Sequence, residues 1–130
     1  PYLSVCTTST HDMNPLRAWW EEDRSVTDRF YHEVLHGEGD TPWFCEPWIC
    51  RRIIGMHLSS PAMFTILPLQ DWLSMDGGLR LQMPDRERIN VPAIPRYYWR
   101  YRMHLTLERL LAEEDFNTTM RDMIAMSRRR

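Results

Sequence analysis

Residues 3–15 of the chain are LSVCTTSTHDMNP. Residues 3–8 are short, β-prone and bounded by polar residues, which predicts a buried strand. Asn14 and Pro15 predict the start of a helix, because asparagine is a favoured N-cap and proline is favoured at the first helical position. This stretch therefore predicts a strand that passes through a polar turn at residues 9–12 into a helix.

A second apolar run indicates a second strand. Residues 62–67 are continuously apolar, as is typical of a strand buried on both faces in a parallel sheet. Between the two strands, we expect one helix over residues 15–37 and another over residues 47–59. The first of these has apolar residues at three- and four-residue intervals on one face. They are Leu16, Trp19, Trp20, Val26, Phe30 and Val34.

The second half of the chain predicts short helices and one long loop. Residues 69–75 indicate a helix of one or two turns, and residues 79–97 an irregular loop, of a length that is usually functional or disordered. Thr106 is expected to cap the next helix, Asn117 to begin the last one, and residues 128–130 to form a solvated tail.

Two parallel strands with helical crossovers form the βα unit of an α/β fold, but two strands cannot make a sheet that covers itself. The last two βα units of a (β/α)8 TIM-type barrel, plus terminal helices, fit this order, since a complete barrel needs about 250 residues. We expect residues 1–130 to be the C-terminal part of a single catalytic barrel domain, with no complete second domain. As a separate, helix-rich fragment, it is expected to self-associate or repack because its strand edges are unpaired.

Composition and charge exclude several classes of protein. Of the 130 residues, 16 are basic, all of them arginine, and 18 are acidic, and the formal net charge of −2 argues against a nucleic-acid partner. No apolar run approaches the ~20 residues of a membrane-spanning helix. The N-terminal residues lack the pattern of a signal peptide, and three scattered cysteines suit reduced thiols, so we expect a cytoplasmic protein.

The cysteines give little support for a metal site. Cys45 and Cys50 are spaced too widely for a CxxC pair, and no second cysteine pair completes a zinc site. His11 or His57 could be imagined as a third ligand, but buried structural thiols explain the cysteines better. We therefore expect no bound metal.

Carboxylates at the C-terminal ends of the predicted strands are the candidates for chemistry, because a barrel carries its active site there. Asp12 lies just before a helix N-terminus, which favours its ionised form. It could be a functional carboxylate or only the cap of the helix that begins at Pro15. His11 could donate to a bound hydroxyl or be a structural histidine, and Asp71 is interpreted as a helix cap.

Residues 96–102, RYYWRYR, alternate aromatic side chains with arginine. They could stack nucleobases, stack sugar rings, or form a strand-like core segment with its arginines reaching solvent. The net charge weakens the first interpretation, and the alternation favours a structural role. No motif of a serine esterase, kinase, nucleotide-dependent dehydrogenase or zinc protease occurs.

Four stretches, in the same order and with sensible spacing, resemble the C-terminal end of the 4-alpha-glucanotransferases, also called amylomaltases or disproportionating enzymes. The stretches are residues 9–20, 68–73, 87–92 and 98–103. The sequence WWEED at 19–23 and YWRYRM at 98–103 are closest to the branch that includes the plant cytosolic-type enzyme and its bacterial relatives. The resemblance extends over nearly the whole chain.

This resemblance implies a (β/α)8 barrel that transfers α-1,4-glucan units between malto-oligosaccharides, or from maltose to a glucan acceptor, with retention and without a cofactor. It implies that Asp12 is the catalytic carboxylate that stabilises the transition state, that His11 bonds hydroxyls of the sugar at the cleavage point, and that Asn90 approaches the substrate from the loop after the last strand. The nucleophile and the acid/base are expected upstream of Pro1, so the isolated chain is expected to be inactive. The alternative is a non-catalytic carbohydrate-binding or protein-interaction fragment.

Overall fold

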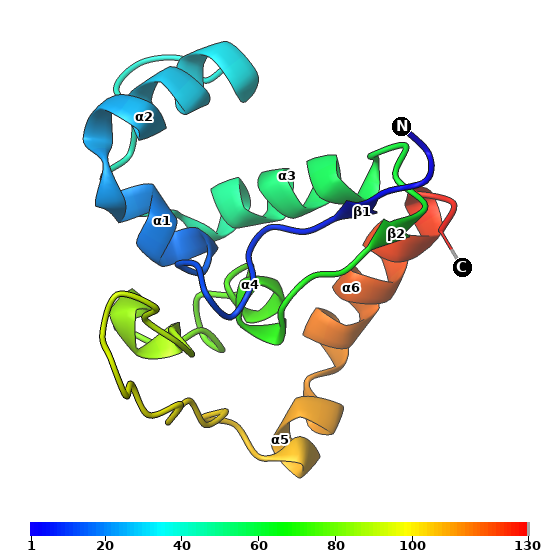
Figure 1. Ribbon diagram of the computed structural model, residues 1–130. Coiled ribbons are helices and arrows are strands. Elements are labelled where there is room, and N and C mark those ends of the chain that lie inside the picture. The colour runs from blue at the N-terminus through cyan, green and yellow to red at the C-terminus, as the bar shows by residue number, and fades with distance from the viewer. Residues whose placement is uncertain (130) are drawn as a thin grey trace.

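The computed structural model describes residues 1–129 and contains one parallel strand pair with helices packed on one side of it (Figure 1). Strand β1 (Val5–Cys6) pairs with β2 (Phe64–Thr65), as the sequence predicts, and Val5 lies opposite Phe64. The helical elements are α1 (Leu16–Glu22), α2 (Arg24–Arg29), the π-helix η1 (Phe30–Val34), α3 (Pro47–Leu58), α4 (Leu69–Leu73), the 3₁₀-helix η2 (Pro84–Glu87), α5 (Leu107–Ala112) and α6 (Glu114–Met126).

Both strands are shorter than predicted, and they are not buried on both faces. On one face, the side chains of Leu3, Val5, Phe64 and Ile66 are each more than half exposed. The other face packs on a helix, since Thr65 Oγ1 donates to the carbonyl of the α3 residue His57 at 3.2 Å. The predictions of a buried strand over residues 3–8 and of a strand buried on both faces over residues 62–67 are therefore wrong, because helices pack on only one side of this strand pair within residues 1–129.

The single helix expected over residues 15–37 is broken at Asp23. This residue is extended (φ −136°, ψ 106°), and its carboxylate accepts from the first backbone N–H groups of α2, at 2.9 and 3.3 Å. A new N-terminus therefore forms inside the predicted helix. The break also turns the buried stripe, so that Val26 and Val34 are exposed while Thr27 and Leu35 are buried.

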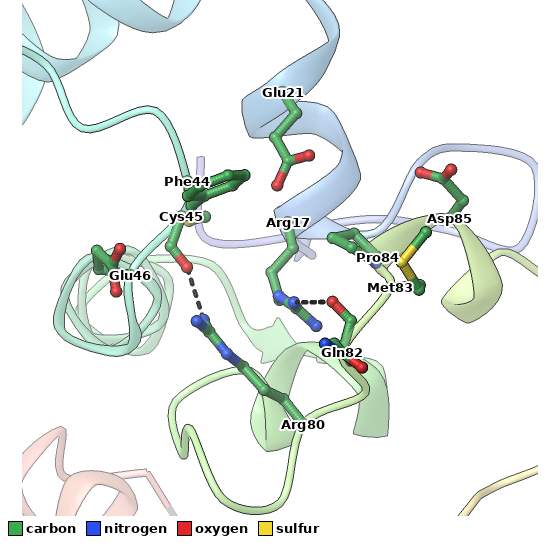
Figure 2. Close-up of a pocket in the computed structure, with 10 residues that line it drawn as sticks. All are labelled: Arg17, Glu21, Phe44, Cys45, Glu46, Arg80, Gln82, Met83, Pro84 and Asp85. Atoms are coloured by element: carbon green, nitrogen blue, oxygen red, sulfur yellow. Dashed lines mark hydrogen bonds between the residues drawn. The ribbon is translucent and has the colours of Figure 1, made fainter.

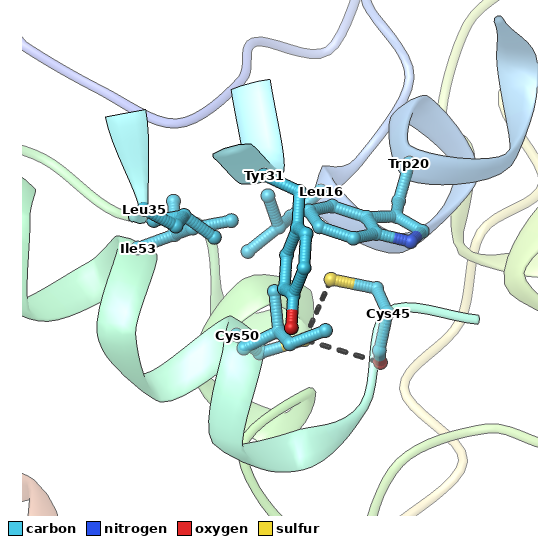
Figure 3. Packing of buried hydrophobic residues seen from close by; sticks show 8 residues of the cluster. Leu16, Trp20, Tyr31, Leu35, Cys45, Cys50 and Ile53 are labelled. Carbon is cyan, nitrogen blue, oxygen red and sulfur yellow. Dashed lines mark hydrogen bonds between the residues drawn. The ribbon is translucent and has the colours of Figure 1, made fainter. Parts of the chain in front are cut away.

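The main core joins α1, η1 and α3. Trp20 of α1 packs edge-on against Tyr31 of η1, with ring centroids 6.4 Å apart, and both lie over the buried apolar face of α3 (Figure 3). Cys45 and Cys50 lie in this core as buried thiols, with their Sγ atoms 3.3 Å apart, whereas Cys6 is half-buried. A second cluster, around Phe116, joins α6 to α4.

The C-terminal elements follow the sequence prediction with two corrections. Thr106 caps α5 by accepting a backbone N–H at 3.1 Å. The last helix begins at Glu114 rather than at Asn117, whose side chain bonds a carbonyl of α5 instead. Arg129 is not in a solvated tail, because its Nε donates to the carbonyl of Leu58 at 2.7 Å. The last residue of the predicted tail, 130, lies outside the described residues.

Asp71 connects the end of β1 to the start of α1. Its carboxylate, 1% exposed, accepts from the hydroxyls of Thr8 and Ser9 and from the backbone N–H of Leu16 at 2.9 Å. The sequence predicts Asp71 as a cap for its own short helix, but the structure uses it to cap α1. Asn14, the predicted cap of α1, makes no capping bond; its side chain donates to a glutamate at the far end of that helix.

This arrangement predicts that Asp71→Asn destabilises the protein by about 2 kcal/mol, because an amide N–H₂ then faces groups that need an acceptor. The measurement is the free energy of unfolding in urea. Asp23→Asn is the matched control, since asparagine caps helices as well as aspartate does. Equal losses in the two variants would contradict the role of Asp71.

Candidate functional site

The three site residues named by the sequence lie together, although 78 positions separate two of them. Asn90 Nδ2 donates to Asp12 Oδ1 at 2.6 Å, and the Asn90 backbone N–H donates to the carbonyl of His11 at 3.1 Å. The imidazole Nε2 of His11 lies 3.4 Å from the other carboxylate oxygen of Asp12. Both of these side chains are about half exposed, so the cluster can meet a ligand from solvent.

The geometry excludes the interpretation of Asp12 as the cap of α1. The backbone N–H of Leu16, at the start of that helix, donates to Asp71, and the carboxylate of Asp12 instead faces the side chains of Asn90 and His11. A half-exposed carboxylate fixed by two neighbours can hold hydroxyl groups or stabilise a positive charge that develops beside it.

Arg88 holds the backbone on both sides of this cluster and was not singled out from the sequence. Its Nε donates to the carbonyl of Asn90 at 2.8 Å, and other guanidinium nitrogens donate to the side chain of Asn14 and to the carbonyl of Asp12. A planar guanidinium can make such bonds in several directions at once. The signal in the sequence that could have indicated this role is the position of Arg88, two residues before Asn90.

An aromatic side chain completes the cluster. The indole of Trp99 lies against the imidazole of His11, with centroids 4.9 Å apart, and is 60% exposed. Residues 96–102 are therefore not the strand-like core segment that the alternation favoured: Tyr98 is also exposed, and no strand includes them. An exposed aromatic face beside polar groups suits stacking on a flat ring of a ligand.

A buried ion pair joins the long loop of residues 79–97 to α1. Arg17 Nη1 lies 3.2 Å from Glu87 Oε1, and the two side chains are 7% and 2% exposed. Arg17 also donates to the carbonyl of Leu81 at 2.6 Å, and Gln70 of α4 donates to the carbonyl of Glu87. Because Glu87 immediately precedes Arg88, this pair positions the segment that delivers Asn90.

Burial raises the pKa of Glu87 to about 7, although the Arg17 guanidinium opposes the rise; the carboxylate of Asp71 adds to it. The second carboxyl oxygen of Glu87 has no hydrogen-bond partner among the described residues. The carboxyl group that supports the site therefore changes its protonation near neutral pH.

Two further features bear on the class of site. Within residues 1–129, no three His, Cys, Asp or Glu side chains are grouped so that they could hold a metal ion. No helix in the same range combines the length and the apolar character needed to cross a membrane.

Comparisons with known sequences agree on one family. A family model described as 4-alpha-glucanotransferase matches residues 1–107. The 4-alpha-glucanotransferase DPE2 of Oryza sativa subsp. japonica is 38% identical over 128 residues, which are 98% of this chain and 14% of the relative. A 4-alpha-glucanotransferase of Chlamydia pneumoniae is 32% identical over 116 residues, 88% of this chain and 22% of the relative. The chain thus spans less than a quarter of the length of these relatives.

A solved structure supports the same fold. An amylomaltase from Streptococcus agalactiae, determined in complex with acarbose, superposes with a TM-score of 0.69 at 17% sequence identity. The superposition covers 97% of this chain and 22% of that one. The elements of this chain therefore have the arrangement of a section of that larger protein.

The raised pKa of Glu87 generates a pH prediction. Between the ordinary value of 4.5 and the folded value of about 7, the folded protein binds more protons than the unfolded chain, so the stabilisation from this group is lost as pH rises through 7. We expect the free energy of unfolding to fall from about pH 5 to pH 7.5 in the wild type, relative to Glu87→Gln. Parallel profiles for the two proteins in urea titrations would show that Glu87 does not titrate in this way.

Proposed function

The chain belongs to the 4-alpha-glucanotransferase family, and from this premise we propose that it is the C-terminal section of a (β/α)8 barrel that transfers α-1,4-glucan units between malto-oligosaccharides, or from maltose to a glucan acceptor. The observation that carries the proposal is the contact between Asp12 and Asn90, which brings together residues of two separate motifs. The similarity of fold to an amylomaltase supports it. We place this barrel section in the cytoplasm.

Retaining glycosyl transfer requires stabilisation of positive charge. The transition state resembles an oxocarbenium ion, with charge spread over the anomeric carbon and the ring oxygen of the sugar. The carboxylate of Asp12 is oriented by Asn90 on one oxygen and lies near His11 on the other. In our proposal, Asp12 binds the distorted sugar and stabilises that charge, because fixed groups need no reorganisation during the reaction.

The neighbouring residues would select and position the sugar. The imidazole of His11 can bond a hydroxyl at the cleavage point, and Asn90 both orients Asp12 and offers its amide to the substrate. Trp99 presents an exposed aromatic face beside them, on which the apolar face of a pyranose ring can lie. No cofactor enters this chemistry.

The complete reaction needs two further carboxyl groups. A retaining enzyme places a nucleophile and an acid/base about 5–5.5 Å apart, on opposite faces of the scissile bond. We propose that these groups belong to strands upstream of Pro1, in line with the small share of its relatives that this chain spans. Residues 1–130 alone should then release no glucose from maltotriose; measurable turnover by the purified chain would overturn this assignment.

The exposed apolar face of the strands supports the second part of the proposal, on partners. As a separate piece, the chain exposes Leu3, Val5, Phe64 and Ile66 side by side. Exposed apolar surface next to unpaired strand edges favours association. The alternative function is a non-catalytic fragment that binds sugar or another protein. It predicts binding of malto-oligosaccharides, or a defined oligomer, without turnover.

In the full-length protein that carries this chain, Asp12→Asn should lower the rate of maltotriose disproportionation by roughly 10²–10³-fold, because it removes charge stabilisation in the transition state. Glucose release is the measurement. Asp122→Asn, an exposed carboxylate on α6, is the matched control. An Asp12 variant as active as this control would favour the non-catalytic alternative.

A further inference from the structure

A second feature of the surface lies outside the Asp12 cluster, in the loop that precedes α3. This loop is held firmly at both ends. The guanidinium of Arg24 donates to the carbonyls of Thr41 and Pro42, the indole N–H of Trp20 donates to Pro42 at 3.0 Å, and Arg80 donates to the carbonyl of Cys45 at 2.7 Å. The backbone between these anchors is therefore fixed before any ligand binds.

This fixed loop presents two consecutive aromatic side chains to solvent. Trp43 is 73% exposed and Phe44 is 61% exposed. One face of the Trp43 indole is covered by the guanidinium of Arg24, 4.5 Å from the ring centroid, which holds the ring in place. Adjacent large aromatic groups, exposed on a rigid loop, are typical of a binding surface.

Two hollows adjoin at Phe44 and share Glu21. The first, of about 360 Å³, lies between α1 and the two aromatic side chains. The second, of about 410 Å³, extends from Phe44 past Arg17 and Arg80 toward Asp85, as Figure 2 shows. We call these two hollows together the α1 groove.

The α1 groove combines aromatic faces with charged groups of both signs. The carboxylates of Glu21, Glu46 and Asp85 line the groove together with the guanidinium group of Arg80. Arg17 also lines it, but its side chain is only 7% exposed and is bonded to Glu87. Such a mixture gives no preference for an anion or a cation. It does suit a neutral ligand with many hydroxyls, because carboxylates accept from hydroxyl groups, guanidinium groups donate to them, and aromatic rings stack on the apolar faces of sugar rings.

The α1 groove lies at the same end of the strands as Asp12. The strands are parallel and α3 runs back between them, so the N-terminal end of α3 and its preceding loop are near the ends of the strands, beside α1 (Figure 1). A third hollow includes Glu21 and Asp85 of the groove and also Asn14 and Arg88. Arg88 donates to the side chain of Asn14 and also to the backbone carbonyl of Asp12.

We propose that the α1 groove binds the extension of a long malto-oligosaccharide whose reacting unit lies at Asp12, with Trp43 and Phe44 as its stacking platforms. This inference rests on the proposed function and adds to it a preference for long chains. The groove would bind sugar units remote from the cleaved bond, so it acts on the affinity for long glucans and leaves the chemistry at Asp12 unchanged.

The test compares two substrates in the full-length protein. For Trp43→Ala and Phe44→Leu, the ratio of kcat/KM for maltoheptaose to that for maltotriose should fall roughly three- to tenfold, the loss expected for one stacking contact. The loss should appear in KM rather than in kcat. Trp43→Phe, which keeps an aromatic face, should restore most of the ratio.

A matched control and a direct binding measurement complete the experiment. Trp48→Ala removes another half-exposed tryptophan, outside the groove, and should leave the ratio unchanged. Calorimetry in the slow Asp12→Asn background, with and without the Trp43→Ala change, measures the affinity for maltoheptaose and for a β-1,4-linked glucan of equal length. If Trp43→Ala weakens the binding of maltoheptaose but not that of the β-1,4-linked glucan, the result supports glucan binding in the α1 groove.

An unchanged ratio, or equal losses for both substrates, would overturn the proposal. A change in oligomeric state with an unchanged ratio would show that Trp43 and Phe44 contact protein instead of sugar, and would overturn it as well. If the wild-type protein turns over neither substrate, the proposed function fails. Calorimetry then still decides whether the groove binds a glucan.

Discussion

The carboxylate of Asp71 is the constraint on which the rest of this structure depends. The end of β1 must turn sharply into α1, and the turn leaves two hydroxyls and a helix N–H pointing inward. Buried donors of this kind need an acceptor, because an unpaired polar group away from water costs more than the bond contributes. One carboxylate from α4 satisfies all three, and so it fixes the direction in which His11 and Asp12 leave the strand.

A second buried contact fixes the segment of the long loop that carries Asn90. The pair of Arg17 and Glu87 joins α1 to the long loop, and Arg88 then bonds the backbone of both Asn90 and Asp12. The exposed cluster thus rests on two buried supports that come from different parts of the chain. The half-exposed carboxylate of Asp12 keeps its orientation because the segments that carry Asp12 and Asn90 are fixed by these buried contacts.

The sequence predicted those features that short segments determine alone. The parallel strand pair, the helix from Pro47 and the cap at Thr106 follow from local apolar patterns and capping residues. It did not predict the break at Asp23, because the acidic run there suits both an exposed helix face and a new N-cap. It also missed the role of Asp71, since no local pattern shows that a residue caps a helix 55 positions away. The spacing of residues in the sequence does not show that Asn90 lies near Asp12. Asn90 was named as a site residue only because of the resemblance to a known family.

The hydrogen bonds of Asp71 also have a consequence for the order in which the molecule folds. They join residues 55 to 63 positions apart, and the bond between Asn90 and Asp12 spans 78. Contacts this distant form only after long loops have closed, whereas helices such as α3 and α6 form from neighbouring residues. We therefore expect the polar cluster to form after the local contacts of α3 and α6, so that a chain with native helical content can still lack the contact between Asp12 and Asn90.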